Sequence, residues 1–370
     1  MRIGIDSRSL NQKGLGVGRY LFNLLRHYPE LDRSNEYLLY IKKKGLPSAL
    51  SNFRSKAISL PLINSNLAWL NLRLPVELVK DKIDLFHCPF YGLPVYQPCP
   101  MVVTIHDIIY EIHPEWFPKL QGASFRFLSR LGAKTAKKII AVSEHTKKDI
   151  MERYHVPEKK IEVIYEAPDD RYRMIKDEAL LKRIEQKYGI TKDFLIHVGA
   201  IHERRNIISL LKVFKRLKES GRDLQLVLVG SIQWSFIDLK RMLLYMGLKS
   251  DVIHLEYISD EDLVCLYNAA RLFVYPSLYE GFGLPLVEAM ACGTPIAASN
   301  VSSIPEVVGD AAVLFDPYNE DEMLDSIRMV IDDKSARDSL ISRGLSRVKR
   351  YSWTTAAKRT IELYNQAVKG

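Results

Sequence analysis

The sequence has few cysteines and no long apolar segment, and each of these features excludes a class of protein. Its 370 residues contain four cysteines, and no two of them have C-x-x-C spacing. We therefore expect buried thiols in a reducing compartment, without a disulfide framework or a zinc cluster. No apolar run approaches the length of a bilayer-spanning helix. Residues 1–6 are typical of a first strand and not of a signal peptide, so we expect a cytoplasmic protein.

The first half of the chain has few acidic residues for its number of basic ones. Residues 1–160 carry 25 Lys and Arg against 14 Asp and Glu, a net charge of +11, whereas the remainder carries 28 against 30, a net charge of −2. This asymmetry predicts an anionic partner for the N-terminal half, with nucleic acid and a membrane surface as candidates. No helix-turn-helix, zinc or RNA-binding signature accompanies the charge, so we expect no nucleic acid partner.

Apolar runs of strand length alternate with helical patterns along the whole chain. In the first half they lie near residues 2–6, 36–42, 57–62, 84–89, 101–107, 138–143 and 161–166; in the second half, near 194–199, 224–230, 252–257, 272–276, 295–299 and 312–315. This alternation predicts an α/β fold of parallel sheets covered by helices on both faces. A break near residues 167–170 divides the chain into two doubly wound domains. Ligands of such domains bind at the carboxyl ends of the strands.

The strongest chemical signal is the stretch of residues 277–288, which lies between a predicted strand and a predicted helix. Gly281 and Gly283 allow backbone N–H groups to approach a ligand closely, and Pro285 suits the first turn of a helix. The helix directs its positive end into the same space, which predicts a phosphate site. Glu280 and Glu288 would repel a phosphate, so we interpret them as acceptors for the hydroxyls of a sugar and a ribose.

Three other loops follow predicted strands. The first contains Gly14, Gly16 and Gly18; its G-x-G-x-G spacing fits a nicotinamide fingerprint poorly, and a flexible surface turn is the alternative. The second delivers His106 and Asp107 to the end of an apolar strand, where a structural role is also open. The third carries Arg204 and Arg205 next to a helix that begins near Asn206. Two adjacent cations in this position are typical of an anion clamp.

The stretch Glu280-Gly281-Phe282-Gly283-Leu284-Pro285 with Glu288 resembles the donor-binding signature of retaining glycosyltransferases of the GT-B architecture, especially glycosyltransferase family 4. The resemblance continues through residues 289–295 and covers essentially the whole chain. It implies two Rossmann-like, doubly wound parallel-sheet domains that face each other across a cleft. It also implies that the last helix returns to the first domain. The expected domains are therefore residues 1–168 with 354–370, binding the acceptor, and residues 169–353, binding the nucleotide-sugar donor.

The resemblance implies roles for individual residues. His106 would hydrogen-bond the donor sugar, and Asp107 would either orient its loop or touch the acceptor. Arg204 matches the family, whereas Arg205 replaces its usual Lys. The predicted catalytic residues are His106, Asp107, Arg204, Arg205 and Glu280, and the predicted donor-binding residues are Gly16, Arg204, Arg205, Glu280, Gly281, Phe282, Gly283, Leu284 and Glu288. The segment after Gly230 and residues 256–258 would lie near the nucleobase. For Ser143, helix capping is favoured over a role near the cleft.

The chemistry implied is metal-independent and cofactor-free transfer of a hexose with retention, because the arginines and loop amides would stabilise the departing diphosphate. Same-face attack is favoured over double displacement, since no second carboxylate is evident. The motifs further resemble bacterial mannosyltransferases of surface polysaccharide assembly. This favours GDP-mannose and a glycan or polyprenyl-linked acceptor; the alternatives are a UDP-sugar donor or a non-catalytic basic binding protein. A glucan phosphorylase is disfavoured, because no segment looks like its pyridoxal-bearing Lys.

A basic stripe is predicted on the helix between residues 114 and 136. Arg126, Arg130 and Lys134 follow one another at intervals of four residues. With Trp116 and Phe117 expected to be exposed nearby, the stripe favours peripheral docking on an anionic membrane. An ordinary solvated basic face is the open alternative.

Overall fold

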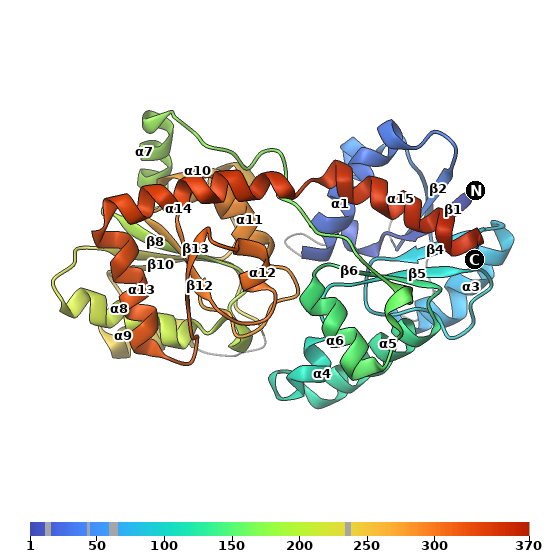
Figure 1. Cartoon of the computed structure of the whole chain (residues 1–370), viewed down its shortest axis with the longest axis horizontal. Coiled ribbons are helices and arrows are strands. Elements are labelled where there is room, and N and C mark those ends of the chain that lie inside the picture. Colours follow the sequence, from blue (N-terminus) through green and yellow to red (C-terminus); the bar gives the residue numbers. More distant parts are fainter. Residues whose placement is uncertain (12–15, 43–44, 59–65, 234–237, 370) are drawn as a thin grey trace. The chain divides into compact units, whose positions relative to one another are not determined.

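The computed structural model describes residues 1–11, 16–42, 45–58, 66–233 and 238–369, and it divides the chain into two compact units. The first unit is Met1–Glu166 with Ser352–Gly370, and the second is Ala167–Tyr351 (Figure 1). Gly14 of the predicted glycine loop lies outside the described residues, as do residues 234–237 of the predicted nucleobase segment. The assignment of acceptor and donor to separate domains stays a prediction.

The first unit contains a parallel sheet of seven strands in the order β3-β2-β1-β4-β5-β6-β7. The strands are β1 (Arg2–Asp6), β2 (Glu36–Ile41), β3 (Arg54–Ala57), β4 (Leu85–Cys88), β5 (Met101–Ile105), β6 (Lys138–Ala141) and β7 (Ile161–Val163). The five residues of β5, Met-Val-Val-Thr-Ile, are all buried. Such unbroken apolar strands are expected where helices cover both faces of a parallel sheet.

The helices of the first unit include one from the far end of the chain. They are α1 (Gly16–Leu31), α2 (Asn66–Ala68), α3 (Leu74–Lys80), α4 (Ile109–Ile112), α5 (Lys119–Thr135), α6 (Glu144–Tyr154) and α15 (Trp353–Lys369). In this unit, α15 lies beside α1 on one side of the sheet, while α5 and α6 lie on the other side (Figure 1). The terminal helix therefore covers part of a sheet whose last strand ends almost 200 residues earlier in the sequence.

The second unit repeats this plan with six parallel strands in the order β10-β9-β8-β11-β12-β13. The strands are β8 (Phe194–Val198), β9 (Gln225–Val229), β10 (Val252–Leu255), β11 (Leu272–Tyr275), β12 (Ile296–Ser299) and β13 (Ala312–Phe315). The helices are α7 (Glu178–Lys187), α8 (Ile207–Glu219), α9 (Leu239–Met246), α10 (Asp260–Ala269), α11 (Leu284–Ala291), α12 (Ile304–Val308), α13 (Glu320–Asp332) and α14 (Lys334–Arg347). Two doubly wound α/β sheets confirm the predicted fold class.

One strand was predicted in the wrong place. The apolar residues 57–62 were expected to form the third strand, but β3 is Arg54–Ala57, and residues 59–65 lie outside the described part. β3 is an edge strand that pairs with β2 alone, and three of its four residues are exposed. An edge strand with exposed side chains carries charge instead of an apolar run, so its sequence does not reveal it.

A chain of buried polar groups joins α15 to the sheet of the first unit. The hydroxyl of Tyr364 lies 2.7 Å from Nδ1 of His87 and 2.9 Å from the hydroxyl of Tyr28. Nε2 of His87 lies 2.8 Å from Oγ1 of Thr104, which lies 3.1 Å from the hydroxyl of Tyr20. Burial lowers the pKa of His87 to about 3, so the ring is neutral. These bonds connect α15, α1, β4 and β5 inside the core.

We predict that Tyr364→Phe destabilises the protein by about 1–3 kcal/mol, because it removes one partner from both His87 and Tyr28 in a buried setting. Urea unfolding measures the change. Tyr318→Phe is the matched control, since Tyr318 is 70% exposed. An equal effect of the two substitutions would show that the buried network adds nothing to stability.

Candidate functional site

In the second unit, two loops meet where the strand order reverses, between β8 and β11. The loop after β8 leads through a short 3-10 turn, η6 (Glu203–Arg205), into α8, and the loop after β11 leads into α11. The N–H group of Leu278 donates to the carbonyl of Arg204 at 2.8 Å and ties the two loops together. The reversal point of a doubly wound sheet is where such folds bind ligands. The predicted Arg204, Arg205 and Glu280 all lie on these loops.

The structure brings Arg205 and Glu280 together as a buried ion pair. Nη1 of Arg205 donates to Oε1 of Glu280 and to the hydroxyl of Tyr275, and it lies 3.3 Å from Oγ of Ser277. Nη2 of Arg204 is 3.9 Å from Oε2 of Glu280. The side chains of Arg205 and Glu280 are only 9% and 5% exposed. The sequence placed both residues at the site but did not predict that they bind each other.

The charges of this cluster follow from its burial. Burial alone raises the pKa of the Glu280 carboxyl, but the charges of Arg204 and Arg205 outweigh it and hold the pKa below its ordinary value. Burial and the charge of Arg205 lower the pKa of His197 to about 3, and burial and both arginines lower that of His202 to about 2. The cluster therefore holds two guanidinium groups, one carboxylate and two neutral imidazoles, a net charge of +1.

The guanidinium of Arg205 lies directly against the backbone at the end of β8. Gly199 has a φ of +146°, and a Cβ atom there would be 3.0 Å from Cζ and 3.1 Å from Nε of Arg205. Only glycine adopts this φ readily and leaves room for the guanidinium. Nε of Arg205 is buried without a hydrogen-bond partner among the described residues. An anion that reached this atom would satisfy it.

Two serines hold the loop before α11, and sequence reasoning missed both. The N–H group of Glu280 donates to Oγ of Ser302 at 3.0 Å. Oγ of Ser303 donates to the carbonyls of Glu280 at 3.0 Å and Phe282 at 3.2 Å. Gly283, with a φ of +96°, directly precedes α11, and Pro285 lies in its first turn as predicted. The serines lie just before α12, where a Ser-Ser-Ile-Pro sequence was the available signal.

Other predicted donor-binding residues are less open than the sequence suggests. Phe282 is 3% exposed and packs edge-on against Tyr351, with ring centroids 5.5 Å apart. Glu288 is also 3% exposed, and the hydroxyl of Tyr267 donates to its Oε2 at 3.3 Å. Gly281 and Gly283 are buried, and Leu284 is partly buried. Their contacts with a donor stay predictions.

In the first unit, His106 lies just after β5 with both ring nitrogens engaged. Nδ1 is 2.9 Å from Oε1 of Glu166, and Nε2 is 3.1 Å from the carbonyl oxygen of Pro89. Burial lowers the pKa of His106, but the hydrogen bond and charge of Glu166 outweigh it, so the pKa is raised above its ordinary value. A bond from this ring to a sugar hydroxyl, which was predicted, would have to replace one of these two contacts. Glu166 was not predicted as a site residue.

Asp107 and Ser143 order the backbone around His106. Oδ1 of Asp107 accepts from the hydroxyl of Tyr91 at 2.9 Å and from the N–H of Ile109, at the start of α4, at 3.1 Å. Of the two roles left open for Asp107, these bonds support orientation of the loop. Ser143 caps α6 as expected, because its side chain accepts from the N–H of Thr146. Gly16, a predicted donor-binding residue, is the first residue of α1.

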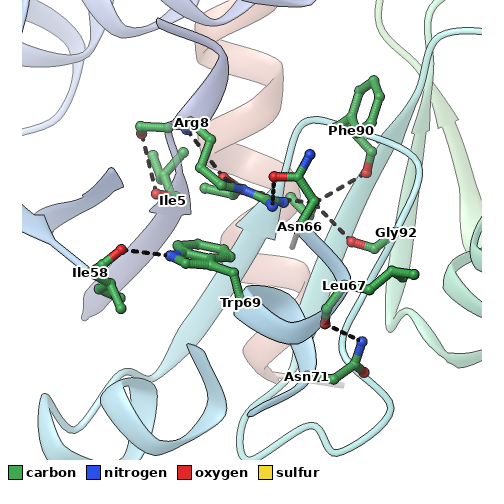
Figure 2. A network of polar contacts seen from close by, with 12 residues as sticks. Ile5, Arg8, Ile58, Asn66, Leu67, Trp69, Asn71, Phe90 and Gly92 are labelled. Carbon is green, nitrogen blue, oxygen red and sulfur yellow. Dashed lines mark hydrogen bonds and ion pairs between the residues drawn. The ribbon is translucent and has the colours of Figure 1, made fainter. Parts of the chain in front are cut away.

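A second polar cluster follows β1, next to the reversal point of the first sheet. Nε and Nη2 of Arg8 donate to the carboxylate of Asp6 at 2.9 and 2.6 Å. The guanidinium carbon lies 4.2 Å from the centre of the Trp69 ring, and Nη1 is 3.4 Å from Oδ1 of Asn66 (Figure 2). The indole of Trp69 donates to the carbonyl of Ile58 at 3.0 Å. This cluster holds Asn66 and Trp69 against Arg8, two residues beyond β1, and sequence reasoning did not identify it.

Acidic residues with D-x-D spacing begin α10 but do not form a metal centre. Asp260 pairs with Arg171 at 2.9 Å, and Asp262 accepts from Lys187 at 2.6 Å and Tyr188 at 2.5 Å. Within the described residues, no three His, Cys, Asp or Glu side chains are grouped to hold a metal ion. All four cysteines, each in the described part, are free thiols.

The predicted basic stripe on α5 is altered in two respects. Phe117 was expected to be exposed, but it is 8% exposed and packs on Tyr110, with ring centroids 4.1 Å apart, so this expectation was wrong. Arg130 donates to both carboxylate oxygens of Glu111, which offsets its charge. The helix exposes apolar side chains instead, Leu120 at 88% and Phe127 at 62%. Among the described residues, no helix is both long and apolar enough to cross a membrane.

Comparisons with known proteins match the chain along its length. Residues 182–347 match the family described as "Glycosyl transferases group 1", and residues 15–171 match "Glycosyltransferase Family 4". O-antigen chain mannosyltransferase B of Escherichia coli is 32% identical over 98% of this chain and 99% of its own length. O-antigen chain mannosyltransferase RfbU of Salmonella typhimurium is 28% identical over 94% of this chain and 95% of its own. Anabaena HepE, solved with UDP and glucose, has a TM-score of 0.78 at 20% identity, covering 98% of this chain and 99% of its own, a similarity that shows the fold.

We predict that Gly199→Ala destabilises the protein more than Gly221→Ala does, because its Cβ would lie 3.0 Å from Cζ of Arg205 and would force the guanidinium to shift within a buried ion pair. Both glycines have positive φ values, but a Cβ at Gly221 would meet no atom within 4 Å. The control thus carries backbone strain of about 1–3 kcal/mol without the contact. Urea unfolding of both variants measures the difference. Equal losses would contradict close packing of Arg205 on Gly199.

Proposed function

Since the chain belongs to glycosyltransferase family 4 and is a hexosyltransferase of GT-B fold, we propose that it transfers mannose from GDP-mannose, with retention of configuration, to a glycan or polyprenyl-linked acceptor in bacterial surface polysaccharide synthesis. The full-length similarity to two O-antigen chain mannosyltransferases supports the sugar and the pathway. HepE was solved with UDP, so a UDP-sugar donor is the second candidate.

The observation that carries the proposal is the cluster where β8 and β11 end. Arg204, Arg205 and the start of α11 are positive groups on adjoining loops, and Glu280 lies among them. A diphosphate requires positive charge and N–H donors, which a helix N-terminus and guanidinium groups supply. We therefore assign the donor diphosphate to this cluster and the hydroxyls of the transferred sugar to Glu280, without a metal ion or a further cofactor.

The transfer would break the bond between the anomeric carbon and the diphosphate oxygen. The acceptor hydroxyl would form the new bond on the same face, and its proton would pass to the departing phosphate, which keeps atoms and charge in balance. Double displacement would need a further carboxylate on the opposite face of the sugar ring, and Glu280 is assigned to the sugar hydroxyls, so same-face attack is preferred. The arginines would stabilise the negative charge that develops on the leaving group.

We predict that Glu280→Gln lowers kcat/KM by at least about a hundredfold. The amide does not neutralise the charge of Arg205, and it accepts hydrogen bonds from hydroxyls at one atom instead of two. The assay follows GDP release from GDP-mannose with a membrane extract that contains acceptor. Glu219→Gln is the control, since Glu219 is an exposed residue of the same unit at the end of α8. Near-normal transfer by the Glu280 variant would refute the assigned role.

A thermal-shift screen tests the donor separately from turnover. GDP and GDP-mannose are expected to raise the Tm more than UDP, ADP and their sugars, since a ligand that binds only the folded state stabilises it by mass action. The shift by GDP should shrink in Arg204→Ala, which removes one of the two guanidinium groups. A larger Tm shift with UDP than with GDP would favour the second candidate, a UDP-sugar donor, over GDP-mannose.

We also propose that α5 rests on the cytoplasmic face of an anionic membrane. Leu120 and Phe127 are seven residues apart, so they project from one side of the helix. Lys134, seven residues beyond Phe127, projects from the same side of the helix. The first 160 residues carry a net charge of +11. Exposed apolar side chains flanked by cations are the pattern of interfacial helices.

We predict that wild-type protein sediments with phosphatidylglycerol vesicles and that the double variant Leu120→Glu, Phe127→Glu does not. Binding should weaken as salt rises, because screening reduces the attraction of the basic side chains. The matched control is Leu244→Glu with Tyr245→Glu, which changes an equally exposed apolar pair on α9 in the second unit. Equal binding by both double variants, or none by wild type, would refute this docking surface.

A further inference from the structure

His106 and Glu166 form a buried pair that the sequence did not predict. Glu166 is the last residue of the first unit, three residues beyond the end of β7, and His106 directly follows β5. Glu166 is 4% exposed, and the side chain of His106 is 14% exposed. The pair is therefore held by the sheet and shielded from water.

The two contacts of the His106 ring decide its protonation. Each ring nitrogen faces an atom that can only accept a hydrogen bond, a carboxylate oxygen of Glu166 and the carbonyl oxygen of Pro89. A neutral imidazole has a single N–H group and can satisfy one such acceptor; the imidazolium has two and satisfies both. The geometry by itself thus favours the charged ring.

We propose that Glu166 is a positioning residue for the predicted catalytic residue His106, which it keeps as an imidazolium at the end of β5. The ring then presents a fixed positive charge and a fixed orientation, and His106 neither accepts a hydrogen bond nor takes up a proton during turnover. The raised pKa of His106 agrees with this arrangement. The importance of the charge for transfer rests on the proposed function, whereas the protonation state does not.

The groups around His106 are consistent with a single cation. Glu166 and Asp107 are the acidic groups near the ring, and both raise the pKa of His106. His87 on β4 is neutral, and the charge of His106 contributes to its low pKa. The ring of Tyr20 from α1 meets the imidazole edge-on with centroids 4.9 Å apart, and burial keeps its hydroxyl protonated. Thr146 of α6 donates to the His106 carbonyl at 3.2 Å.

NMR of the full chain labelled with ¹⁵N-histidine tests the proposal without any substrate. His106→Gln assigns the signal. In the wild type, we expect both ring nitrogens of His106 to stay protonated above the ordinary midpoint of histidine, and in Glu166→Gln the midpoint should fall by at least about one pH unit. Glu162→Gln is the matched control, because Glu162 lies on β7 and pairs with Arg359 instead. A wild-type midpoint at or below 6.5 would overturn the proposal whether or not the variants fold.

The same variants extend the test to stability and turnover. Because the pKa of His106 is raised on folding, the pair stabilises the protein fully below the unfolded pKa, and this contribution is lost as the pH rises through the raised value. Glu166→Gln should therefore lower the Tm more at pH 6 than at pH 9. Its GDP-release profile should lose activity at lower pH than the wild type does. An unchanged profile with a shifted NMR midpoint would remove the role in transfer but keep the charge state.

Discussion

A buried ion pair between Arg205 and Glu280 is the interaction on which the second unit's site depends. Removing two charges from water costs several kcal/mol per ion unless their hydrogen bonds are satisfied. The neighbouring groups meet this requirement: Tyr275 and Ser277 contact the same guanidinium, and the serines before α12 hold the backbone of Glu280. The bare backbone of Gly199 lets the guanidinium lie close to the sheet. The contacts that satisfy the buried charges therefore also tie the loops to each other and to α12.

The six strands of the second sheet follow the same order as the first six strands of the first sheet, but the two sheets place their polar groups differently. In the second unit, the ion pair joins the loops after β8 and β11, on either side of the reversal point. In the first, the reversal point lies between β1 and β4, and the Asp6–Arg8 pair there is covered by Trp69. The paired His106 instead follows β5. In both units the polar groups therefore lie in loops at the carboxyl ends of the strands, as the fold requires. Which of these loops holds the polar cluster depends on the individual side chains.

Much of the fold was predictable from the sequence because buried parallel strands are continuous apolar runs. Twelve of the thirteen predicted strands coincide with observed ones over most of their length, whereas the third shares only Ala57 with β3, a charged edge strand. The donor motif was equally visible, since its residues are adjacent in sequence. Partners were not visible: Glu166 lies 60 residues from His106, and Glu280 lies 75 residues from Arg205. Such pairs are set by packing, and neither a pattern nor a spacing of residues records them.

The observed pairing changes how the proposed donor site would operate. Glu280 was interpreted as an acceptor for sugar hydroxyls, yet without a donor it neutralises Arg205, and the cluster keeps one net positive charge. A diphosphate that bound Arg204 and Arg205 would compete with Glu280 for the same guanidinium. If the guanidinium of Arg205 moves toward the phosphate, the carboxylate of Glu280 loses a hydrogen-bond donor. Hydroxyls of the attached sugar would replace that donor. On the proposed function, therefore, binding of the phosphate and recognition of the sugar are coupled through one buried charge, and neither half of the donor alone would bind as well as the two joined.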